Sequence, residues 1–524
     1  MRRRTFLKNG LEFVAANALF SRVAMGAGDA GATAPVFSTD NQRWQKVYEK
    51  AIGVLAANVQ VMPRFSGPVL IEGSEYGGIW QECGPHEALV YRYFRPDAAR
   101  NGHMTFFDLQ RPDGQLPANN KRTEAGFGQI QMVVPIAATA WELASATGDG
   151  ELLEAAYNAC SRWDAWLVRY RNTRGTGLVE GFCTYDTGMD NSPRWTGVPV
   201  RCPDADAKRY APGSKMPRLC PDLSATVYGG RLALASMADV LGKRNEADMW
   251  RERAVGMRKL ILKRLYSSED ATFYDVDADD QFVKVRSDIL TRICGEHVVD
   301  QKTFDEMWAR QLGNARAFWP QFPFPSVALD DPLFVHRLPH NSWGGASQAL
   351  TALRAGRWMD HYGRSAEFAH LMEQWCEALQ RDTSFRQQLD PIAGTFTKGD
   401  LPNYSPACLV LYDFTWRLAG VREENGQLQW NIRADSPVAA NARFQVGLRK
   451  GTAEMRYKNG AAKLILGGRE IGEVAGTVRL ITDGSGKPLS VLGVSMSLQE
   501  VELRLKDRPH QHIQLKPNQT ILLS

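Results

Sequence analysis

The distribution of apolar positions divides the chain into two unequal parts. From about residue 41 to residue 420, apolar residues recur at the spacing of three and four that places them on one face of a helix. From residue 422 onward, short segments alternate apolar and polar residues, and Gly, Asn, Asp and Pro separate them, which is typical of strands joined by turns. The pattern therefore predicts a helical domain followed by roughly 100 residues of β-structure.

The helical part is organised in pairs, in which the first segment is rich in small and apolar residues and the second is more charged. Such a difference is expected between a buried inner helix and a half-exposed outer one. The three clearest pairs are 126–149 with 151–172, 222–244 with 246–266, and 340–363 with 365–382, and shorter candidates cover 41–60, 84–98, 285–313 and 404–419.

About a dozen helices arranged in hairpin pairs favour an (α/α)6 toroid, in which inner helices surround a central pocket. The hairpins are not similar enough to one another to count as a sequence repeat, so a generic helical array is the alternative. The predicted fold class is mostly α, with the toroid over residues 35–421 and a small C-terminal β-sandwich over residues 422–524. The sandwich concentrates neither acidic residues nor His, which predicts an accessory domain.

The first 34 residues have the composition of an export signal. RRTFLK at residues 3–8 is followed by a modest apolar run and then by small residues up to Ala34. The paired arginines resemble a twin-arginine signal, which makes the twin-arginine export machinery a partner and predicts a periplasmic or secreted protein. A basic amphipathic helix is the alternative. After Ala34 the sequence contains no apolar run long enough to span a membrane, so we expect no membrane contact of the mature form.

Composition narrows the function classes. The chain has 524 residues, 44% of them hydrophobic, and a net charge of +5, of which the export segment contributes +3 through five basic and two acidic side chains. The remaining charge forms no basic run, which argues against a nucleic-acid partner. Eight scattered cysteines show no metal-binding spacing, so we expect neither a metal nor a cofactor. Cys202 and Cys220 flank a loop rich in Pro, Lys and Arg and are the first candidates for a disulfide.

The segment TYDTGMDNSPRW, residues 184–195, is the strongest candidate for chemistry. Its Gly, Asn, Ser and Pro residues exclude a regular helix, and ordering so polar a loop costs conformational entropy unless the loop binds something. Glycosidic bond cleavage needs one protonated carboxyl group and a second carboxylate. Asp186 and Asp190 lie in this loop, although a simple turn explains Asp186 equally well. Fourteen Trp residues supply rings that can stack on sugars.

TGMDNSPRW also resembles the segment that carries the general acid in glycoside hydrolase family 63 and the related trehalases. In that group an Asp lies within a (Thr/Ser)-Gly-x-Asp-x-Ser-x-Arg-Trp pattern. RPDGQLP, PDLSATVYGG and YSPACLVLYDFTWRLAGV are similar to the same group, so the resemblance covers roughly residues 75–421. The mannosylglycerate hydrolase-like six-hairpin glycosidases are the most similar in length. The resemblance implies an (α/α)6 barrel and an inverting hydrolase with Asp190 as general acid.

The same resemblance assigns roles to the neighbours of Asp190. It implies that Asn191 and Arg194 position the sugar and that Trp195 stacks on it, with burial in the core as the alternative for Trp195. HNSWGGAS lacks the Arg-Gly-Pro that follows the Trp in the family, but His340 and Trp343 remain candidates for lining the pocket.

The general base is missing from its expected place. In the family a Glu opens a Glu-x-x-(Asn/Asp)-Pro-x-x-Gly segment, and here the segment reads QQLDPIAG, so Gln387 replaces it. An amide cannot take a proton from water. Asp390, three residues further along the same loop, is the first candidate base, although Asp before Pro commonly opens a turn.

Glu296 and Glu82 are further candidates to replace the missing base. Glu296 is the fallback, on a different helix pair. GIWQECGPHEA contributes Glu82 and His86 as polar groups at the rim of the pocket.

These observations predict an exported glycoside hydrolase that acts on a carbohydrate with a glucosyl- or mannosyl-type linkage. A polysaccharide lyase or a glycoside phosphorylase on the same toroid is the enzymatic alternative. The missing base fits phosphorolysis, in which inorganic phosphate is the nucleophile. A non-catalytic carbohydrate-binding protein is the alternative from a different class, because a fold by itself does not define a function.

The export assignment predicts that Arg3→Lys combined with Arg4→Lys keeps the protein in the cytoplasm, because the exporter recognises the arginine pair. Fractionation of bacteria that express the double variant measures this directly. Undiminished recovery from the periplasm would remove the twin-arginine assignment.

Overall fold

The computed structural model describes residues 34–213, 215–337, 340–424, 426–448 and 451–523. The predicted export signal lies outside the described residues, apart from Ala34. Within the described chain, no helix combines the length and the apolar character that a membrane span requires.

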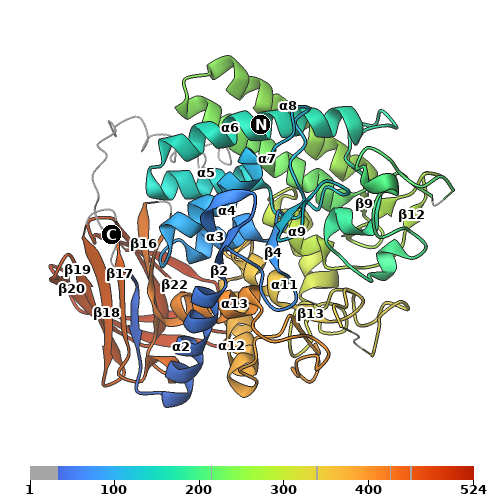
Figure 1. The fold of residues 1–524 in the computed structure, drawn as a ribbon. Coiled ribbons are helices and arrows are strands. Elements are labelled where there is room, and N and C mark those ends of the chain that lie inside the picture. Colours follow the sequence, from blue (N-terminus) through green and yellow to red (C-terminus); the bar gives the residue numbers. More distant parts are fainter. Residues whose placement is uncertain (1–33, 214, 338–339, 425, 449–450, 524) are drawn as a thin grey trace, which may run out of the picture.

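The helices lie between residues 42 and 419 and form one body, with the C-terminal strands packed on one side of it (Figure 1). Their bounds are α2 Gln42–Ala57, α3 Gly84–Tyr91, α4 Pro96–Asp108, α5 Ile136–Thr147, α6 Gly150–Tyr170, α7 Pro221–Val240, α8 Arg244–Arg264, α9 Ile289–Gly295, α10 Gln301–Met307, α11 Ala349–Arg354, α12 Ser365–Arg381 and α13 Ser405–Ala419.

Alternate helices contact one another in order. α3, α5, α7, α9, α11 and α13 form a series of neighbours, and α13 also contacts α3. α4, α6, α8 and α12 pack on α3, α5, α7 and α13, respectively, and α2 also packs on α13. α7 is buried along most of its length, whereas α8 buries one stripe, Ala247, Trp250, Ala254, Met257 and Ile261. The predicted contrast between inner and outer helices is confirmed for this pair.

Local capping explains the boundary between the first pair of helices. Gly148 takes a left-handed conformation, φ 75°, which ends α5 without the steric cost that a Cβ would add. The Asp149 carboxylate then accepts a hydrogen bond from the backbone N–H of Leu152 at 2.9 Å and begins α6. The boundary between the two helices therefore lies at the position that the ranges 126–149 and 151–172 predict.

Two segments that periodicity assigned to helices are loops instead. α5 begins only after Pro135, because residues 126–135 include Gln131 in a left-handed conformation, φ 44°, that no helix accommodates. Residues 340–346 are likewise irregular, and α11 is confined to Ala349–Arg354. Both loops contribute side chains to the pocket described below.

Within the loops at the ends of the inner helices, short strands pair with one another. β4–β6 form one sheet, β7, β8, β11 and β12 another, and β13 pairs with β14. Their bounds are β2 Val59–Met62, β3 Phe65–Leu70, β4 Gly78–Trp80, β5 Asn119–Lys121, β6 Ala125–Gly126, β7 Glu180–Gly181, β8 Arg218–Leu219, β9 Tyr266–Ser267, β10 Thr272–Phe273, β11 Asp275–Val276, β12 Phe282–Val283, β13 Ser347–Gln348 and β14 Gln388–Leu389.

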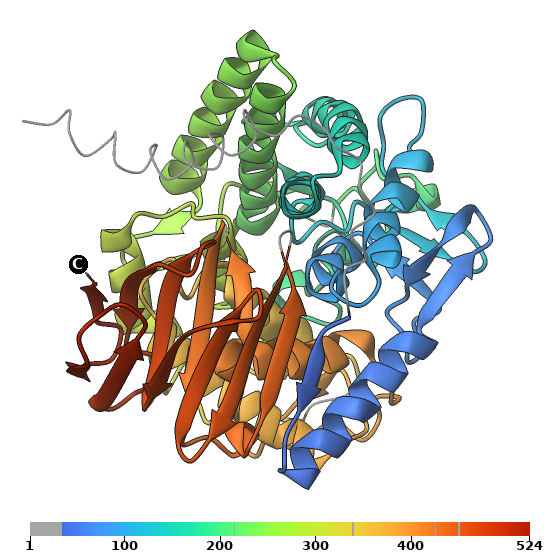
Figure 2. The ribbon, with the colours of Figure 1, turned by 90° about the vertical axis from the view of Figure 1, so that its left-hand side faces the viewer.

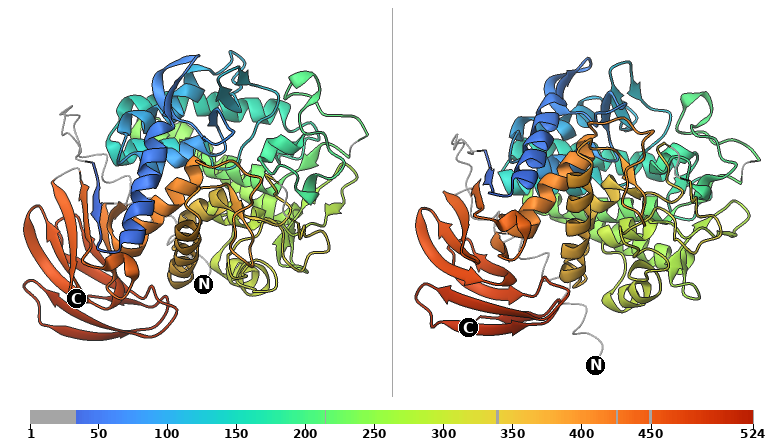
Figure 3. Two further views of the ribbon diagram at one scale, coloured as in Figure 1. Left: turned by 60° about the horizontal axis from the view of Figure 1, so that its bottom comes forward. Right: turned by 90° about the horizontal axis from the view of Figure 1, so that it is seen from below.

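Two antiparallel sheets follow the helices and lie face to face (Figure 3). One has the order β15-β16-β21-β22-β25 and the other β1-β17-β18-β19-β20-β23-β24. The strands are β15 Val421–Glu424, β16 Gln427–Arg433, β17 Arg443–Gly447, β18 Thr452–Lys458, β19 Ala461–Leu466, β20 Arg469–Ala475, β21 Thr477–Asp483, β22 Pro488–Leu492, β23 Gln499–Leu505, β24 Gln511–Leu515 and β25 Thr520–Leu522. The predicted change of structure near residue 422 is therefore confirmed.

The edge strand of the larger sheet comes from the other end of the chain. β1, Val36–Ser38, pairs antiparallel with β17 and lies beside α2 (Figure 2). The Phe37 ring sits 4.5 Å from the ring of Tyr48 on α2 and 4.8 Å from that of Phe444 on β17. This short strand therefore connects the helical body to the sheets, which alternation within residues 422–524 did not indicate.

The predicted pairing of Cys202 with Cys220 is wrong. All eight cysteines are free, and the Cys202 sulfur lies 3.6 Å from that of Cys183. Cys220 immediately precedes α7, and its sulfur contacts the carbonyl oxygen of Arg218. Flanking a loop did not bring Cys202 and Cys220 together, because the backbone around Cys202 instead pairs with the segment that follows Cys183.

Replacing Phe37 by Ala should lower the free energy of unfolding by about 3–5 kcal/mol, because the lost ring leaves a cavity between the helices and the sheet. Val36→Ala on the same strand is the matched control and should cost less than about 0.5 kcal/mol, since Val36 is 40% exposed. Chemical denaturation of both variants measures the difference. Equal effects would contradict the connecting role of β1.

Candidate active site

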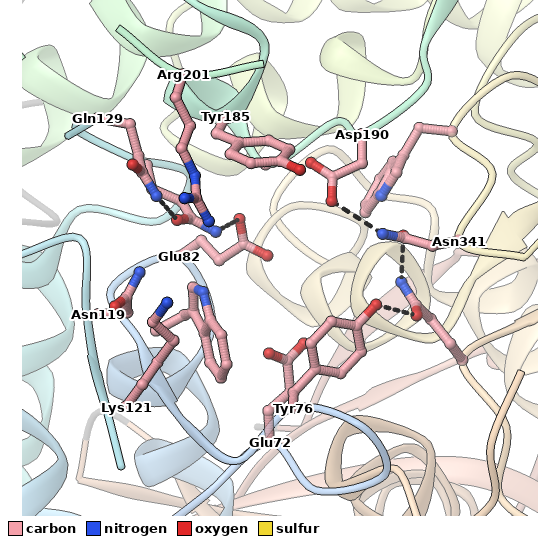
Figure 4. Close-up of a pocket in the computed structure, with 15 residues that line it drawn as sticks. Glu72, Tyr76, Glu82, Asn119, Lys121, Gln129, Tyr185, Asp190, Arg201 and Asn341 are labelled. Atoms are coloured by element: carbon pink, nitrogen blue, oxygen red, sulfur yellow. Dashed lines mark hydrogen bonds between the residues drawn. The ribbon is translucent and has the colours of Figure 1, made fainter. Parts of the chain in front are cut away.

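A polar pocket opens where the loops that precede several inner helices meet (Figure 4). These loops lie before α3, α5, α7, α11 and α13, so the pocket combines side chains more than 300 residues apart in sequence. The lining residues are Glu72, Tyr76, Trp80, Glu82, Asn119, Lys121, Gln129, Gln131, Tyr185, Gly188, Asp190, Arg201, Asn341, Trp343 and Gln387.

Asp190 extends into this pocket from the loop that the sequence singled out. Gly188 and Asn191 on either side take left-handed conformations, φ 61° and 58°, which turn the chain sharply around the carboxylate. Burial raises the pKa of Asp190 to about 6, and the hydrogen bond that its Oδ2 accepts from Asn341 Nδ2 at 2.9 Å partly opposes that rise. Asp190 therefore holds a proton closer to neutral pH than an exposed Asp does.

A chain of hydrogen bonds fixes the Asn341 amide beside Asp190 (Figure 4). The Tyr76 hydroxyl donates to Gln387 Oε1 at 2.9 Å, and Gln387 Nε2 donates to Asn341 Oδ1 at 2.8 Å. Asn341 is thereby oriented to donate its own N–H to Asp190. Gln387 lines the pocket, and its amide holds the Asn341 side chain that donates to Asp190.

Two glutamates share the pocket with Asp190. In Figure 4 the carboxylates of Glu82 and Asp190 face the same open space, with Glu72 below them. Burial raises the pKa of Glu72 well above its usual range, and the charges of Glu82 and Asp190 raise it further. The Tyr404 hydroxyl donates to Glu72 Oε1 at 2.6 Å, but no cation appears among the groups that shift it. Glu72 therefore ionises less easily than an exposed Glu does.

Glu82 differs from Glu72 because positive charges lie near it. Burial raises the pKa of Glu82 to about 7, and the charge of Asp190 adds to the rise, while Arg354 and Arg292 oppose it. Gln131 Nε2 also donates to Glu82 Oε2 at 3.2 Å, which favours the ionised form. Of the two glutamates, Glu82 is the one that ionises more easily.

Gly188 leaves the space that the Glu82 carboxylate occupies. A Cβ at Gly188 would stand 1.6 Å from Glu82 Oε2, so a larger residue would displace this carboxylate. The Asp190 loop and the glutamate are thus in direct contact.

The rest of the lining suits a polyhydroxylated ligand. Trp80 and Trp343 supply aromatic faces, and Asn119, Gln129 and Gln131 supply amide donors and acceptors. Trp343 and Glu82, both candidates from the sequence, do line the pocket. Lys121 and Arg201 add two cationic side chains to the lining on the side of Glu82 (Figure 4).

Three residues next to Asp190 do not line the pocket. Arg194 is 2% exposed and donates to Asp222 and Asp275, at N–O distances of 2.5 to 2.8 Å. Trp195 is buried and donates its indole N–H to Thr187 at 3.0 Å. Asn191 is exposed and donates to the carbonyl oxygen of Asn341. These side chains anchor the loop.

Asp186 is a structural residue at the start of the same loop. Its carboxylate forms a buried ion pair with Arg171, with distances of 2.5 and 3.1 Å. It also accepts hydrogen bonds from the backbone N–H groups of Ile130 at 2.9 Å and Phe182 at 2.6 Å. Asp186 thus joins the Asp190 loop to the segment that carries Gln131.

The other predicted acids and histidines do not reach the pocket. Asp390 accepts the backbone N–H groups of Ile392 and Ala393 at 2.8 Å each, which is the turn that an Asp before Pro commonly forms. Glu296 pairs with Arg357 at 3.4 Å and lies against the inner helix α7. His340 pairs with Asp400 and Glu75, and His86 is buried in α3.

Glu72, Tyr76, Trp80 and Asn341 are pocket residues that sequence reasoning did not select. The first three lie in EGSEYGGIWQE, where three acids and two aromatic residues stand among Gly and Ser. That composition, the same as in the Asp190 loop, could have pointed to them.

Three groups of side chains in the described chain have the spacing of metal ligands. One group is Cys183 with Asp186 and Cys202, and another is Cys220 with Asp222 and Asp275; the carboxylates of both groups already pair with arginines. The third group combines Glu502 on β23 with the exposed His510 and His512, which lie just before β24 and on it. In the pocket, the carboxylate oxygens accept hydrogen bonds from amide and hydroxyl groups. No set of three described pocket side chains converges as metal ligands would.

Comparison with known proteins defines the family. Residues 76–416, well over half of the chain, match the mannosylglycerate hydrolase MGH1-like glycoside hydrolase domain. The chain belongs to this family. It therefore stands among the glycoside hydrolases, in agreement with the resemblance seen in the Asp190 loop.

The curated relatives match over a short segment only. The mannosylglycerate hydrolases MGH1 and MGH2 of Selaginella moellendorffii are each 44% identical over 48 residues, which is 9% of this chain and 10% of theirs. The matched part of the chain thus spans about a tenth of the length of these relatives.

Solved structures share the fold at low sequence identity. A glycoside hydrolase family 63 mannosylglycerate hydrolase from Thermus thermophilus superposes with a TM-score of 0.57 at 20% identity, over 70% of this chain and 99% of that one. Neutral trehalase Nth1 from Saccharomyces cerevisiae has a TM-score of 0.53 at 12% identity, over 70% and 79%. An α-L-rhamnosidase from Dictyoglumus thermophilum matches 93% of this chain and 50% of its own, with a TM-score of 0.53 at 12% identity.

Removing the Asn341 amide should raise the pKa of Asp190 above 6, by about one unit or more, because a hydrogen bond to the charged form is lost. Carboxyl ¹³C titration of Asn341→Ala measures this without any substrate. Asn119→Ala, which removes a pocket amide on the opposite side from Asp190, is the control and should leave the titration unchanged. An unaltered Asp190 titration in Asn341→Ala would refute the proposed orientation of the acid.

Proposed function

We propose that the protein is an exported glycoside hydrolase that cleaves a glucosyl- or mannosyl-type linkage with inversion. Asp190 is the general acid and Glu82 is the general base. The observation that carries the proposal is one pocket in which two buried carboxylates, both with raised pKa, face the same space between aromatic and amide side chains. Inverting hydrolysis needs an acid for the leaving oxygen and a separate base for water.

The two carboxylates titrate as a pair. Each negative charge makes ionisation of the other harder, so the pair passes through a state that holds one proton between its two apparent pKa values. The active form has this proton on Asp190 and the charge on Glu82. With a pKa of about 7 for Glu82 and about 6 for Asp190, this is the less populated of the two one-proton forms, and Arg354 and Arg292 near Glu82 increase its share.

The general base is Glu82 rather than Asp390. Gln387, at the position expected for the base, cannot take a proton from water because its side chain is an amide. Asp390 is engaged in its own turn, and burial raises the pKa of Glu72 well above its usual range, so Glu72 ionises less easily than Glu82. Glu82 is the remaining acid of the pocket, and Gln131 fixes its orientation. A water between the two carboxylates would lose its proton to Glu82 as it attacks the anomeric carbon, while Asp190 protonates the leaving oxygen.

Substrate binding follows from the lining. The rings of Trp80 and Trp343 stack on the apolar face of a sugar, and the amides of Asn119, Gln129 and Gln131 bond its hydroxyl groups. The mannosylglycerate hydrolase name of the family supports a mannosyl- or glucosyl-type linkage.

The closed series of contacts among alternate helices supports an (α/α)6 toroid as the scaffold. The twin-arginine pattern at residues 3–8 supports export to the periplasm or beyond, with removal of the first 34 residues. A substrate outside the cytoplasmic membrane would then meet the pocket.

Phosphorolysis is the second candidate function. Lys121 and Arg201 line the pocket on the same side as Glu82, the proposed base. Two cations there could hold inorganic phosphate, which is itself the nucleophile in this reaction and needs no base. Turnover that depends on phosphate would favour it over hydrolysis.

Asp190→Asn keeps the shape of the acid and removes its proton, so it should lower kcat by about 10²–10⁴ on a natural glycoside. A substrate with an activated leaving group should lose far less, because it needs little protonation. Glu82→Gln should lower the rate by a similar factor on both substrates, because the loss then falls on the activation of water. Rates on the two substrates separate the roles, and ¹H NMR of the first product anomer tests inversion.

Glu75→Gln is the matched control, because Glu75 is a nearby carboxylate that pairs with His340 outside the pocket lining. It should retain turnover. Full activity of Glu82→Gln would exclude Glu82 as the base, and full activity of Asp190→Asn would exclude Asp190 as the acid. An unsaturated product that absorbs in the ultraviolet would instead identify a lyase, and binding without any product would identify a carbohydrate-binding protein.

A further inference from the structure

Two thiols meet beneath the loop that carries Asp190. The sulfur atoms of Cys183 and Cys202 are 3.6 Å apart, and both side chains are buried. With Phe182 and the partly buried Tyr185 they form a small apolar cluster that is separate from the main core. The two thiols therefore face each other within this cluster and not within the main core.

The backbone holds these two thiols in register. Thr184 donates its N–H to the carbonyl oxygen of Pro199 at 3.0 Å, and Tyr185 donates to that of Val200 at 3.1 Å. Cys202 donates its own N–H to the carbonyl oxygen of Gly128 at 3.3 Å. The two arms of the loop are therefore aligned by main-chain contacts that do not involve the sulfur atoms.

We propose that Cys183 and Cys202 form a disulfide that closes the Asp190 loop once the protein reaches an oxidising compartment. The sulfur atoms need to approach each other by only about 1.5 Å to reach bonding distance, which side-chain rotation can supply. The covalent ring would enclose residues 184–201, which contribute Tyr185, Gly188, Asp190 and Arg201 to the pocket. It goes beyond the proposed reaction, since it concerns the thiols alone.

The step requires a disulfide-donating oxidant, such as oxidised glutathione or a thiol–disulfide oxidoreductase. One cysteine, as thiolate, attacks a sulfur of the oxidant and releases the oxidant's other sulfur as a thiolate. The second cysteine then displaces the remaining oxidant sulfur from this mixed disulfide. Two protons and two electrons leave the protein, one S–S bond forms in it, and the oxidant is reduced to two thiols.

Refolding the full chain in a buffer of reduced and oxidised glutathione tests the proposal, because access to the buried sulfur atoms does not then limit the reaction. Alkylation under denaturing conditions, followed by intact mass, should show two adducts fewer than the fully reduced protein with its eight cysteines. Trypsin should release residues 175–194 joined to residues 202–208 by a bond that dithiothreitol breaks. Eight alkylated cysteines, or a link from Cys202 to Cys220, would overturn the proposal.

Stability provides a second measurement. The oxidised wild-type protein should unfold at a higher temperature than the reduced protein, because the bond restricts the unfolded chain. Cys183→Ala combined with Cys202→Ala should remove this redox dependence, and Cys220→Ala, the matched control, should keep it. A redox dependence that survives in the double variant would assign the effect to other cysteines, and the mass measurement on the wild-type chain stands even where the double variant folds poorly.

Discussion

The position of Asp190 depends on a guanidinium group four residues further along the chain. Arg194 is buried between Asp222, at the start of α7, and Asp275, on β11, and its N–H groups reach both carboxylates. Arg292 adds a second cation to Asp222 at 3.3 Å. Charges buried in this way are tolerated only when they are paired, so a shift of the loop would leave several of them uncompensated. The Asp190 loop is thus held by electrostatics rather than by hydrophobic packing alone.

A second buried ion pair holds the other end of the loop. Arg171 and Asp186 meet below it, and the Asp186 carboxylate also receives the backbone N–H of Ile130. The segment that carries Gln131 is thereby fixed to the segment that carries Asp190. Because Gln131 in turn donates to Glu82, the relative placement of Asp190 and Glu82 depends on Arg171 and Arg194.

Gln387 shows why the family's base can be absent without disorder of the site. An amide accepts the Tyr76 hydroxyl proton with its oxygen and donates to Asn341 with its nitrogen, whereas a carboxylate could only accept. A Glu at this position would also add a further negative charge to a pocket that already holds three acids. Gln387 therefore supplies the donor that orients Asn341 and limits the repulsion among the carboxylates.

By itself the sequence determined the paired helices, the change to strands near residue 421 and the special character of the Asp190 loop, because these follow from short-range patterns of apolar spacing and turn residues. Only the tertiary structure decided which side chains reach the pocket. Arg194 and Trp195 are neighbours of Asp190 in sequence but point into the core, since a tight turn sends successive side chains in different directions. Glu72 and Asn341 arrive from loops more than 100 residues away, because the pocket is formed where the ends of distant inner helices meet.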